Sequence, residues 1–277
     1  MMSSGRTEGQ ARAVSPAEGL RAAFAEGRTA LIPYLTAGYP TLEGAYEVGE
    51  AYLEAGADVV EIGVPFSDPL ADGPTIQNTT NRALENGADL GYCFEFASRF
   101  SGRAPVVLLV YYNNIFARGA EEFLSEAAGT GVSGLVIPDL PIDEAVAFRE
   151  MAGEKGVAIC PLVAPTTRDA RLEKAAEAAS GFVYCVSVAG VTGAREVLPQ
   201  GAVELLRRVR QKFSVPAALG FGISTPEAAV EAAEAGAQGV IVGSKLMQIV
   251  ADGGPEAAGA WLRELRAALD RGAGTEG

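Results

Sequence analysis

Three acidic side chains, Glu61, Asp68 and Asp72, stand close together in one stretch of the chain. Glu61 lies inside an apolar run, where burying a charged carboxylate costs free energy unless the group is paired or neutral. Asp68 and Asp72 follow in a loop that contains two prolines. A strand that delivers one acid and a loop that delivers another is the arrangement that acid–base catalysis requires. The alternative is a structural ion pair of Glu61 beside an ordinary polar loop.

The three acids have different surroundings in the sequence. Glu61 is near the end of a predicted strand, and its Val and Ile neighbours would raise its pKa, which suits a general acid or base near neutral pH. Asp72 is on the following loop, which suits a segment that closes over a substrate. Asp68 belongs to Ser67-Asp68-Pro69, which is typical turn chemistry, so we expect a structural role for it.

Three tyrosines are further candidates. Tyr184 lies within the predicted strand at residues 182–187, and its hydroxyl reaches the substrate if the side chain points inward. Tyr111 ends another predicted strand, and Tyr34 is a candidate for an apolar wall of the pocket. A core tyrosine with a satisfied hydroxyl explains Tyr184 and Tyr111 equally well, and a core position is the simpler explanation for Tyr34.

The composition excludes several kinds of chemistry. The chain has 277 residues, a formal net charge of -13 and no histidine. The charge argues against nucleic acid or an anionic membrane as a partner, and no apolar run is long enough to span a bilayer. Without histidine there is no Ser-His-Asp triad and no HExxH zinc site. None of the four lysines ends a predicted strand, so a Schiff-base mechanism is disfavoured, and metal-assisted chemistry is disfavoured because no tight acidic cluster exists.

Cysteine usage bears on the compartment. The three cysteines, Cys93, Cys160 and Cys185, have no CxxC spacing, and we expect reduced thiols in a cytoplasmic protein. Residues 1–14 are expected to be a disordered tail, residues 15–271 a single domain, and residues 272–277 a flexible tail.

The elements that must position these side chains alternate along the chain. Short apolar runs predict eight strands, at residues 30–35, 59–63, 105–111, 134–137, 157–162, 182–187, 217–219 and 239–242. Amphipathic patterns predict helices at residues 42–55, 76–86, 90–100, 120–128, 143–154, 169–178, 202–212, 226–235, 244–251 and 255–271. One further helix begins at Ser15, with Pro16 at its first position and Glu18 completing a capping box.

Eight strand–helix units with strands apolar on both faces predict an α/β fold, a (β/α)₈ barrel with extra helices at the N-terminus, after the second strand and at the C-terminus. A doubly wound open sheet is the alternative, but no G-x-G-x-x-G turn follows the first strand. In a barrel the site lies at the carboxyl ends of the strands.

Glycine turns follow the last three predicted strands. They include Thr192 and Gly193, then Gly222, then Gly243 and Ser244. Such turns let backbone amides approach phosphate oxygens at helix N-termini. Each glycine taken alone is explained by turn geometry, but three consecutive strand ends favour a phosphate site. The residues therefore predict a metal-free acid–base reaction on a phosphorylated small molecule.

Residues 60–77, which read VEIGVPFSDPLADGPTIQ, resemble the signature of the tryptophan synthase alpha chain family. The likeness continues in residues 33–38, 184–193, 220–224 and 243–244. The resemblance implies a (β/α)₈ lyase that cleaves indole-3-glycerol phosphate to indole and glyceraldehyde 3-phosphate. It also implies an αββα heterotetramer with a beta chain that holds pyridoxal phosphate (PLP), and no cofactor or metal in this chain.

The resemblance assigns roles to residues. Glu61 would move the proton, Asp72 would accept a hydrogen bond from the indole N–H, and Tyr184 would line the site. The phosphate would be held by Gly193, Gly222, Gly243 and Ser244. Residues 66–73 and 188–199 would form the lid, while Asn113 and residues 138–141 match regions that face the partner. Another phosphate-binding barrel enzyme and a non-catalytic subunit on the same fold are the competing hypotheses.

Overall fold

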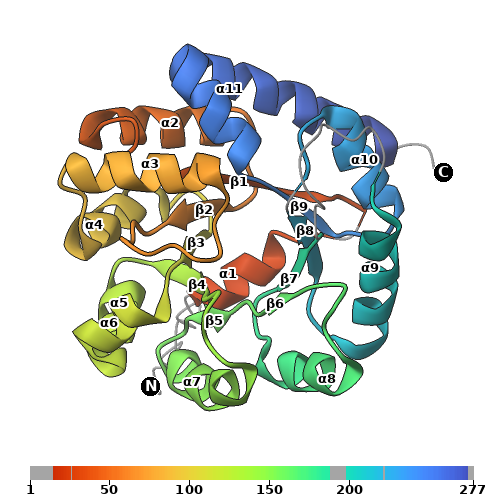
Figure 1. The fold of residues 1–277 in the computed structure, drawn as a ribbon. Coiled ribbons are helices and arrows are strands. Elements are labelled where there is room, and N and C mark those ends of the chain that lie inside the picture. The colour runs from red at the N-terminus through yellow and green to blue at the C-terminus, as the bar shows by residue number, and fades with distance from the viewer. Residues whose placement is uncertain (1–14, 26, 188–197, 221, 274–277) are drawn as a thin grey trace, which may run out of the picture.

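The computed structural model describes residues 15–25, 27–187, 198–220 and 222–273. Within these residues, nine strands form one curled parallel sheet with neighbours in the order β5-β4-β3-β2-β1-β9-β8-β7-β6. The strands are β1 (Ala30–Thr36), β2 (Val60–Gly63), β3 (Val106–Leu109), β4 (Val132–Val136), β5 (Ala158–Ile159), β6 (Leu162–Val163), β7 (Val183–Val186), β8 (Ala217–Gly220) and β9 (Gly239–Val242). Figure 1 looks down the ring that they form.

The ring closes between β5 and β6, which are the two ends of the sheet and are separated only by Cys160 and Pro161. The Cys160 amide donates to the Leu135 carbonyl of β4 at 2.9 Å, and the Pro161 carbonyl accepts from the Tyr184 amide of β7 at 2.9 Å. One extended segment therefore pairs on both sides. The single strand expected at residues 157–162 is divided because Pro161 has no N–H to donate. The eight-stranded barrel prediction is confirmed.

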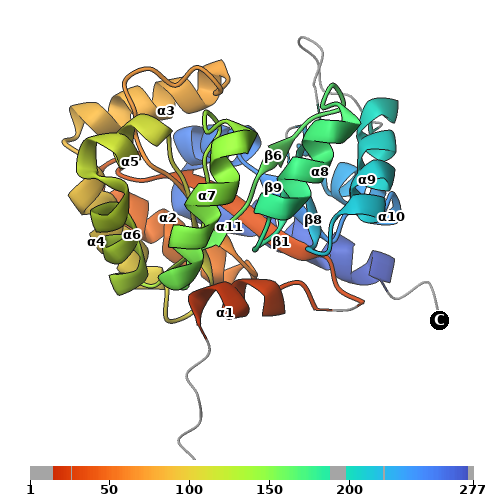
Figure 2. The ribbon, with the colours of Figure 1, turned by 90° about the horizontal axis from the view of Figure 1, so that it is seen from below.

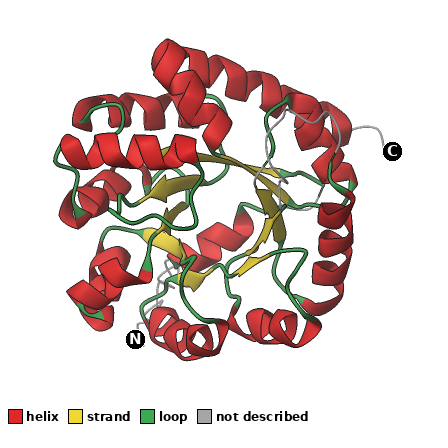
Figure 3. Ribbon diagram, viewed as in Figure 1, coloured by secondary structure: helices red, strands yellow, loops and turns green. Residues whose placement is uncertain are grey.

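Helices surround the sheet on its outer side, except for the first helix, which lies across one end of the ring (Figure 3). They are α1 (Pro16–Ala22), α2 (Leu42–Glu54), α3 (Pro74–Glu85), α4 (Leu90–Phe100), α5 (Tyr112–Arg118), α6 (Ala120–Gly129), α7 (Ile142–Glu154), α8 (Asp169–Ala178), α9 (Gln200–Lys212), α10 (Pro226–Glu234) and α11 (Ser244–Ala273). The three extra helices, α1 before the first strand, α4 after α3 and the part of α11 that follows Gly254, lie where the sequence predicted them. Within the described residues, no helix has the length and apolar character needed to cross a membrane.

Helix α1 lies across the amino-terminal end of the barrel (Figure 2). Its predicted capping box is present: the Glu18 amide donates to Ser15 Oγ at 3.3 Å, and the Ser15 amide donates to Glu18 Oε2 at 2.8 Å. Leu20 is fully buried, and the Phe24 ring lies 5.5 Å from the ring of Phe182. The helix therefore fills the bottom of the barrel with apolar side chains.

One helix differs from the sequence-based expectation. Helix α5 was not predicted, because its polar start, Tyr112-Asn113-Asn114, resembles a loop. The two helices expected at residues 244–251 and 255–271 are confirmed: α11 consists of two helices that meet at a kink at Gly254, where φ is 70°. It continues to Ala273, whereas residues 1–14 and 274–277 lie outside the described residues.

Candidate active site

Glu61 is the centre of the site. It is the second residue of β2 and pairs in register with Tyr34 of β1 and Val107 of β3. Its side chain is 1% exposed, and neither carboxylate oxygen has a hydrogen-bond partner among the described residues. Burial, and then the charge of Asp72, raise its pKa to about 8. A carboxyl group in this state is protonated near neutral pH and is free to exchange its proton.

Asp72 lies on the β2–α3 loop, half-buried, and is held by a tyrosine. The Tyr111 hydroxyl donates to Asp72 Oδ2 at 3.1 Å while it accepts from the Ala71 amide at 3.0 Å. Burial raises the pKa of Asp72, and the Tyr111 hydrogen bond acts in the opposite direction. The Tyr111 ring stacks on Phe66 at 5.0 Å between centroids. Asp72 therefore has a fixed hydrogen-bond partner, whereas Glu61 has none within the part of the chain that the structure describes.

Tyr111 was predicted as a substrate contact at the end of a strand. In the structure β3 ends at Leu109, and Tyr111 precedes the first residue of α5. Its described polar contacts are to the loop that carries Asp72. The sequence contained no local signal for this pairing, because the two residues are 39 positions apart.

Asp68 is exposed and takes part in a turn, as expected. Ser67 Oγ donates to Asp68 Oδ2 at 2.6 Å, and the Leu70 amide donates to the Asp68 carbonyl at 2.9 Å. The loop continues to Asp72, whose carbonyl accepts from Gln77 Nε2 of α3 at 2.9 Å. The loop is thus anchored to the helix that follows it.

Two buried tyrosine rings stand beside Glu61, each in space that a glycine leaves open. A Cβ atom at Gly63 would lie 2.0 Å from the Tyr34 hydroxyl oxygen, and one at Gly220 would lie 2.7 Å from the Tyr184 hydroxyl oxygen. The pKa of Tyr184 is raised by burial and then by the charge of Glu61, and that of Tyr34 by burial and then by the charge of Asp72. Both phenols therefore remain protonated and face the two acids.

The predicted phosphate-binding residues fall into two groups. Thr192 and Gly193 lie outside the described residues. Gly222 follows β8 with φ of 96°, a conformation that L side chains rarely adopt, while Gly243 and Ser244 lie between β9 and the first turn of α11. Because β8 and β9 are neighbours, these turns lie at the same end of the barrel. Ser244 is exposed at the start of a long helix, where amide groups lack intrahelical partners.

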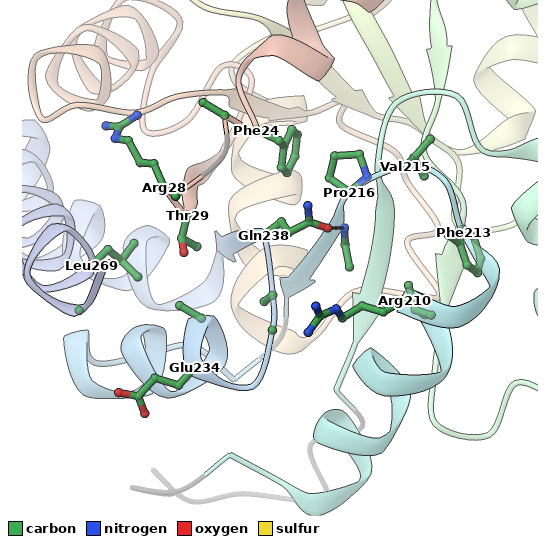
Figure 4. Close-up of a pocket in the computed structure, with 18 of the residues that line it drawn as sticks. Phe24, Arg28, Thr29, Arg210, Phe213, Val215, Pro216, Glu234, Gln238 and Leu269 are labelled. Carbon is green, nitrogen blue, oxygen red and sulfur yellow. Dashed lines mark hydrogen bonds between the residues drawn. The ribbon is translucent and has the colours of Figure 1, made fainter. Parts of the chain in front are cut away.

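A cavity of about 760 Å³ lies at the other end of the barrel (Figure 4). It is lined by residues that precede β1, β8 and β9, among them Arg28, Pro216 and Gln238. Gln238 Oε1 accepts from the Ala217 amide at 3.2 Å. None of the predicted site residues lines this cavity, so it is separate from the two acids.

The barrel holds two acids near one another, Glu61, which has no hydrogen-bond partner among the described residues, and Asp72, which Tyr111 holds on a loop, and this arrangement is typical of a (β/α)₈ barrel enzyme. The family model of the tryptophan synthase alpha chain matches residues 20–269. The tryptophan synthase alpha chain of Thermoanaerobacter pseudethanolicus is 46% identical over 230 residues, which cover 82% of this chain and 87% of the relative. That of Methanosarcina mazei is 48% identical over 224 residues, or 81% and 82% of the two chains.

Solved structures agree with these relatives. A chain in the tryptophan synthase α₂β₂ complex of Pyrococcus furiosus superposes with a TM-score of 0.81 at 42% identity, covering 86% of this chain and 98% of its own. A chain of Mycobacterium tuberculosis tryptophan synthase superposes with a TM-score of 0.84 at 36% identity, and the match covers 90% of this chain and 97% of that one. The chain therefore belongs to the tryptophan synthase alpha chain family and is an indole-3-glycerol-phosphate lyase of tryptophan biosynthesis. The family carries no cofactor of its own, and PLP belongs to the beta chain.

Proposed function

We propose that this lyase cleaves indole-3-glycerol phosphate into indole and glyceraldehyde 3-phosphate by proton transfers through Glu61. The observation that carries the proposal is the carboxyl group of Glu61, which is 1% exposed and has no hydrogen-bond partner among the described residues. Its pKa of about 8 makes it a neutral acid at physiological pH. Acid–base catalysis is most effective when the catalytic pKa is near the working pH.

The reaction needs one proton given and one taken. Protonated Glu61 donates its proton to C3 of the indole ring, which leaves a positive charge on the ring and a carboxylate on Glu61. The carboxylate then accepts the proton of the hydroxyl on the carbon attached to C3. The electrons of that O–H bond form the aldehyde, and those of the C–C bond return to the ring. Glu61 regains its proton, so one residue completes the cycle.

Asp72 is suited to the charge that develops on the ring. As a carboxylate it accepts a hydrogen bond from the indole N–H and stabilises the positive charge produced by protonation at C3. The hydrogen bond from Tyr111 supports this role, because it favours the ionised form of Asp72 and fixes its orientation. Preorganised groups of this kind are each worth on the order of a hundredfold in rate. Tyr184 and Tyr34 provide the walls of the pocket.

The phosphate group is assigned to the turns after β8 and β9. Gly222, Gly243 and the Ser244 hydroxyl lie at adjacent strand ends, and α11 directs its N-terminus to the same place. Thr192 and Gly193 remain predicted contacts from the preceding loop. The protein carries a net charge of -13, so an anion must be held by local amides and a helix end rather than by the overall field.

A beta chain is the proposed partner. The matching Pyrococcus furiosus chain comes from an α₂β₂ complex. On this chain, Leu70 of the β2–α3 loop is 94% exposed and Phe116 of α5 is 74% exposed. The Tyr112 amide donates to Asp139 Oδ1 at 2.7 Å, which joins α5 to the loop at residues 138–141. The family resemblance assigns Asn113, which is in α5, and residues 138–141 to the partner, whereas it assigns the loop that carries Leu70 to the lid.

The compartment and the domain organisation belong to the same proposal. We assign the protein to the cytoplasm, supported by Cys93, Cys160 and Cys185, which are buried and free. A single domain at residues 15–271 is supported by one sheet whose strands come from residues 30–242 and by the terminal helices α1 and α11, which pack against it. A single cooperative unfolding transition tests the latter assignment.

An indole-release assay tests the function. The chain is incubated with indole-3-glycerol phosphate, with and without a tryptophan synthase beta chain, and indole is measured. The matched control is indoleglycerol without its phosphate, for which we expect a much higher KM because the turns after β8 and β9 lose their ligand. Absence of indole in both conditions would overturn the proposal, and equal KM values would overturn the phosphate assignment alone.

A further inference from the structure

Three buried hydroxyl groups form a continuous chain beside Glu61, which we call the Tyr34–Thr36–Thr79 chain. The Tyr34 hydroxyl lies 3.2 Å from Thr36 Oγ1, and Thr36 Oγ1 lies 2.7 Å from Thr79 Oγ1. Thr79 Oγ1 lies 2.9 Å from the Ile76 carbonyl oxygen. The three side chains are at most 5% exposed. The chain therefore runs from β1 into the second turn of α3, out of contact with bulk water.

The end of the chain decides the direction of every hydrogen bond in it. A carbonyl oxygen only accepts, so the single proton of Thr79 is donated to Ile76. Thr36 Oγ1 lies 2.7 Å from Thr79 Oγ1 and 3.9 Å from Met247 Sδ, and the thioether is the weaker acceptor, so Thr36 donates to Thr79. Thr36, whose proton is used, must then accept from Tyr34. The Tyr34 hydroxyl consequently donates its only proton to Thr36, toward α3.

The direction of the hydrogen bond from Tyr34 matters because the phenol lies near Glu61. Tyr34 pairs in register with Glu61, and its hydroxyl occupies the space above Gly63, two residues after Glu61 on the same face of β2. The phenol thus lies on the face of the sheet that carries the Glu61 side chain, yet neither oxygen of Glu61 has a partner among the described residues. The proton that would bond to Glu61 is already bonded to Thr36.

We propose that Thr36 and Thr79 are positioning residues that keep the Tyr34 proton bonded toward α3, so that the carboxyl group of Glu61 stays free for the substrate. A hydrogen bond from Tyr34 would favour the ionised carboxylate and occupy an oxygen that must exchange a proton with the substrate. The inference rests on the proposed role of Glu61. It explains why two threonines lie inside an otherwise apolar contact between β1 and α3.

The test uses steady-state kinetics of indole release. Thr79→Val removes the hydroxyl with little change of shape, and we expect kcat to fall about tenfold while KM changes less than twofold. Thr79→Ser keeps the hydroxyl and should restore kcat to within twofold of the wild type. Thr80→Val is the matched control, because Thr80 is an equally buried threonine of α3 outside the chain. If Thr79→Val does not fold, Thr36→Val is used in its place, because it breaks the Tyr34–Thr36–Thr79 chain on the β1 side.

A double variant separates this role from simple packing. In the Tyr34→Phe background there is no phenol proton to direct, so adding Thr79→Val should change kcat less than twofold from that of Tyr34→Phe. A packing role for Thr79 would reduce kcat equally in both backgrounds and would overturn the inference, as would wild-type kcat in Thr79→Val. Failure of the wild-type chain to release indole would instead count against the proposed function.

Discussion

Asp58 and Glu61 are three residues apart, at opposite ends of the same short segment, and their surroundings are opposite. Asp58 Oδ2 accepts from the Leu31 amide at 2.9 Å and from Arg266 at 3.1 Å, while Oδ1 is bonded to Arg28. Arg266 also donates to the Thr29 carbonyl at 3.0 Å. Asp58 therefore ties β1, β2 and α11 together at the amino-terminal end of the barrel.

Glu61 has none of these contacts, although it is more deeply buried than Asp58. Replacing a buried, unpartnered carboxyl group by a neutral group of the same shape should therefore not lower the stability of the fold. If Glu61 is the catalytic acid, as we propose, burial alone does not distinguish it from a structural acid such as Asp58. The absence of a partner, at the active end of a barrel, separates the two cases.

The largest effect is expected from Glu61→Gln. The amide cannot donate a proton to the indole ring or accept one from the hydroxyl, so we expect indole release to fall by about 10³-fold or more. The midpoint of thermal unfolding should not decrease, because no ion pair is lost. Turnover above about a tenth of the wild-type rate, far more than the loss of an essential acid permits, would contradict the assignment of Glu61.

The reverse pattern is expected from Asp58→Asn. Arg28 and Arg266 lose one of their two carboxylate partners and keep only the more exposed Asp270. Because Asp58 is 12% and Arg266 8% exposed, we expect the free energy of unfolding to fall by about 3 kcal/mol. The kcat of the folded enzyme should stay within twofold. Urea unfolding measures the change, with Glu85→Gln as the control, since the Arg82–Glu85 pair is exposed and should be worth less than about 0.5 kcal/mol. If Asp58→Asn and Glu85→Gln lowered the free energy of unfolding equally, Asp58 would not have the structural role that distinguishes it from Glu61.

The pH dependence of stability sharpens the same contrast. The pKa of Glu61 is about 8 in the folded chain against an ordinary value of 4.5, so between these values the native state holds a proton that the unfolded state has lost. The contribution of this proton to the free energy of unfolding is fully present below pH 4.5 and is lost as pH rises through 8. Between these values the free energy of unfolding falls by about 1.4 kcal/mol per pH unit. Unfolding curves of the wild type and Glu61→Gln should diverge in this window, and parallel curves would show that Glu61 is not protonated.

The smallest effect is expected from Tyr111→Phe, which removes the donor to Asp72 and retains the stacking on Phe66. One hydrogen bond is worth about 1 kcal/mol, so kcat/KM should fall about fivefold. The pKa of Asp72 should rise, which moves the acidic limb of the pH–rate profile to higher pH. Tyr112→Phe, at the adjacent position, is the control. An unchanged acidic limb would mean that Tyr111 does not support Asp72.

Features set by local sequence were predictable. The capping box of Ser15 and Glu18, the barrel order of strands and the burial of Glu61 follow from residue patterns over a few positions. The contacts that organise the site could not be predicted from such local patterns. Tyr111 meets Asp72 across 39 residues, and Thr36 meets Thr79 across 43. Such pairs depend on how strands and helices come together in space. Similarly, the division of β5 from β6 at Pro161 depends on pairing to β4 and β7 at once.

The two tyrosine–glycine neighbours also constrain how this pocket changes in evolution. A Cβ atom at Gly63 would lie 2.0 Å from the Tyr34 oxygen, and one at Gly220 would lie 2.6 Å from Cε1 of Tyr184. Alanine at either glycine is therefore excluded while the ring remains, but becomes acceptable once the tyrosine has been replaced by a smaller residue. The order of substitution matters, with the ring lost first and the glycine second. The tyrosine and the glycine of each pair, which lie on neighbouring strands, are therefore expected to change together. Single substitutions will show fewer acceptable residues at these positions than double substitutions will.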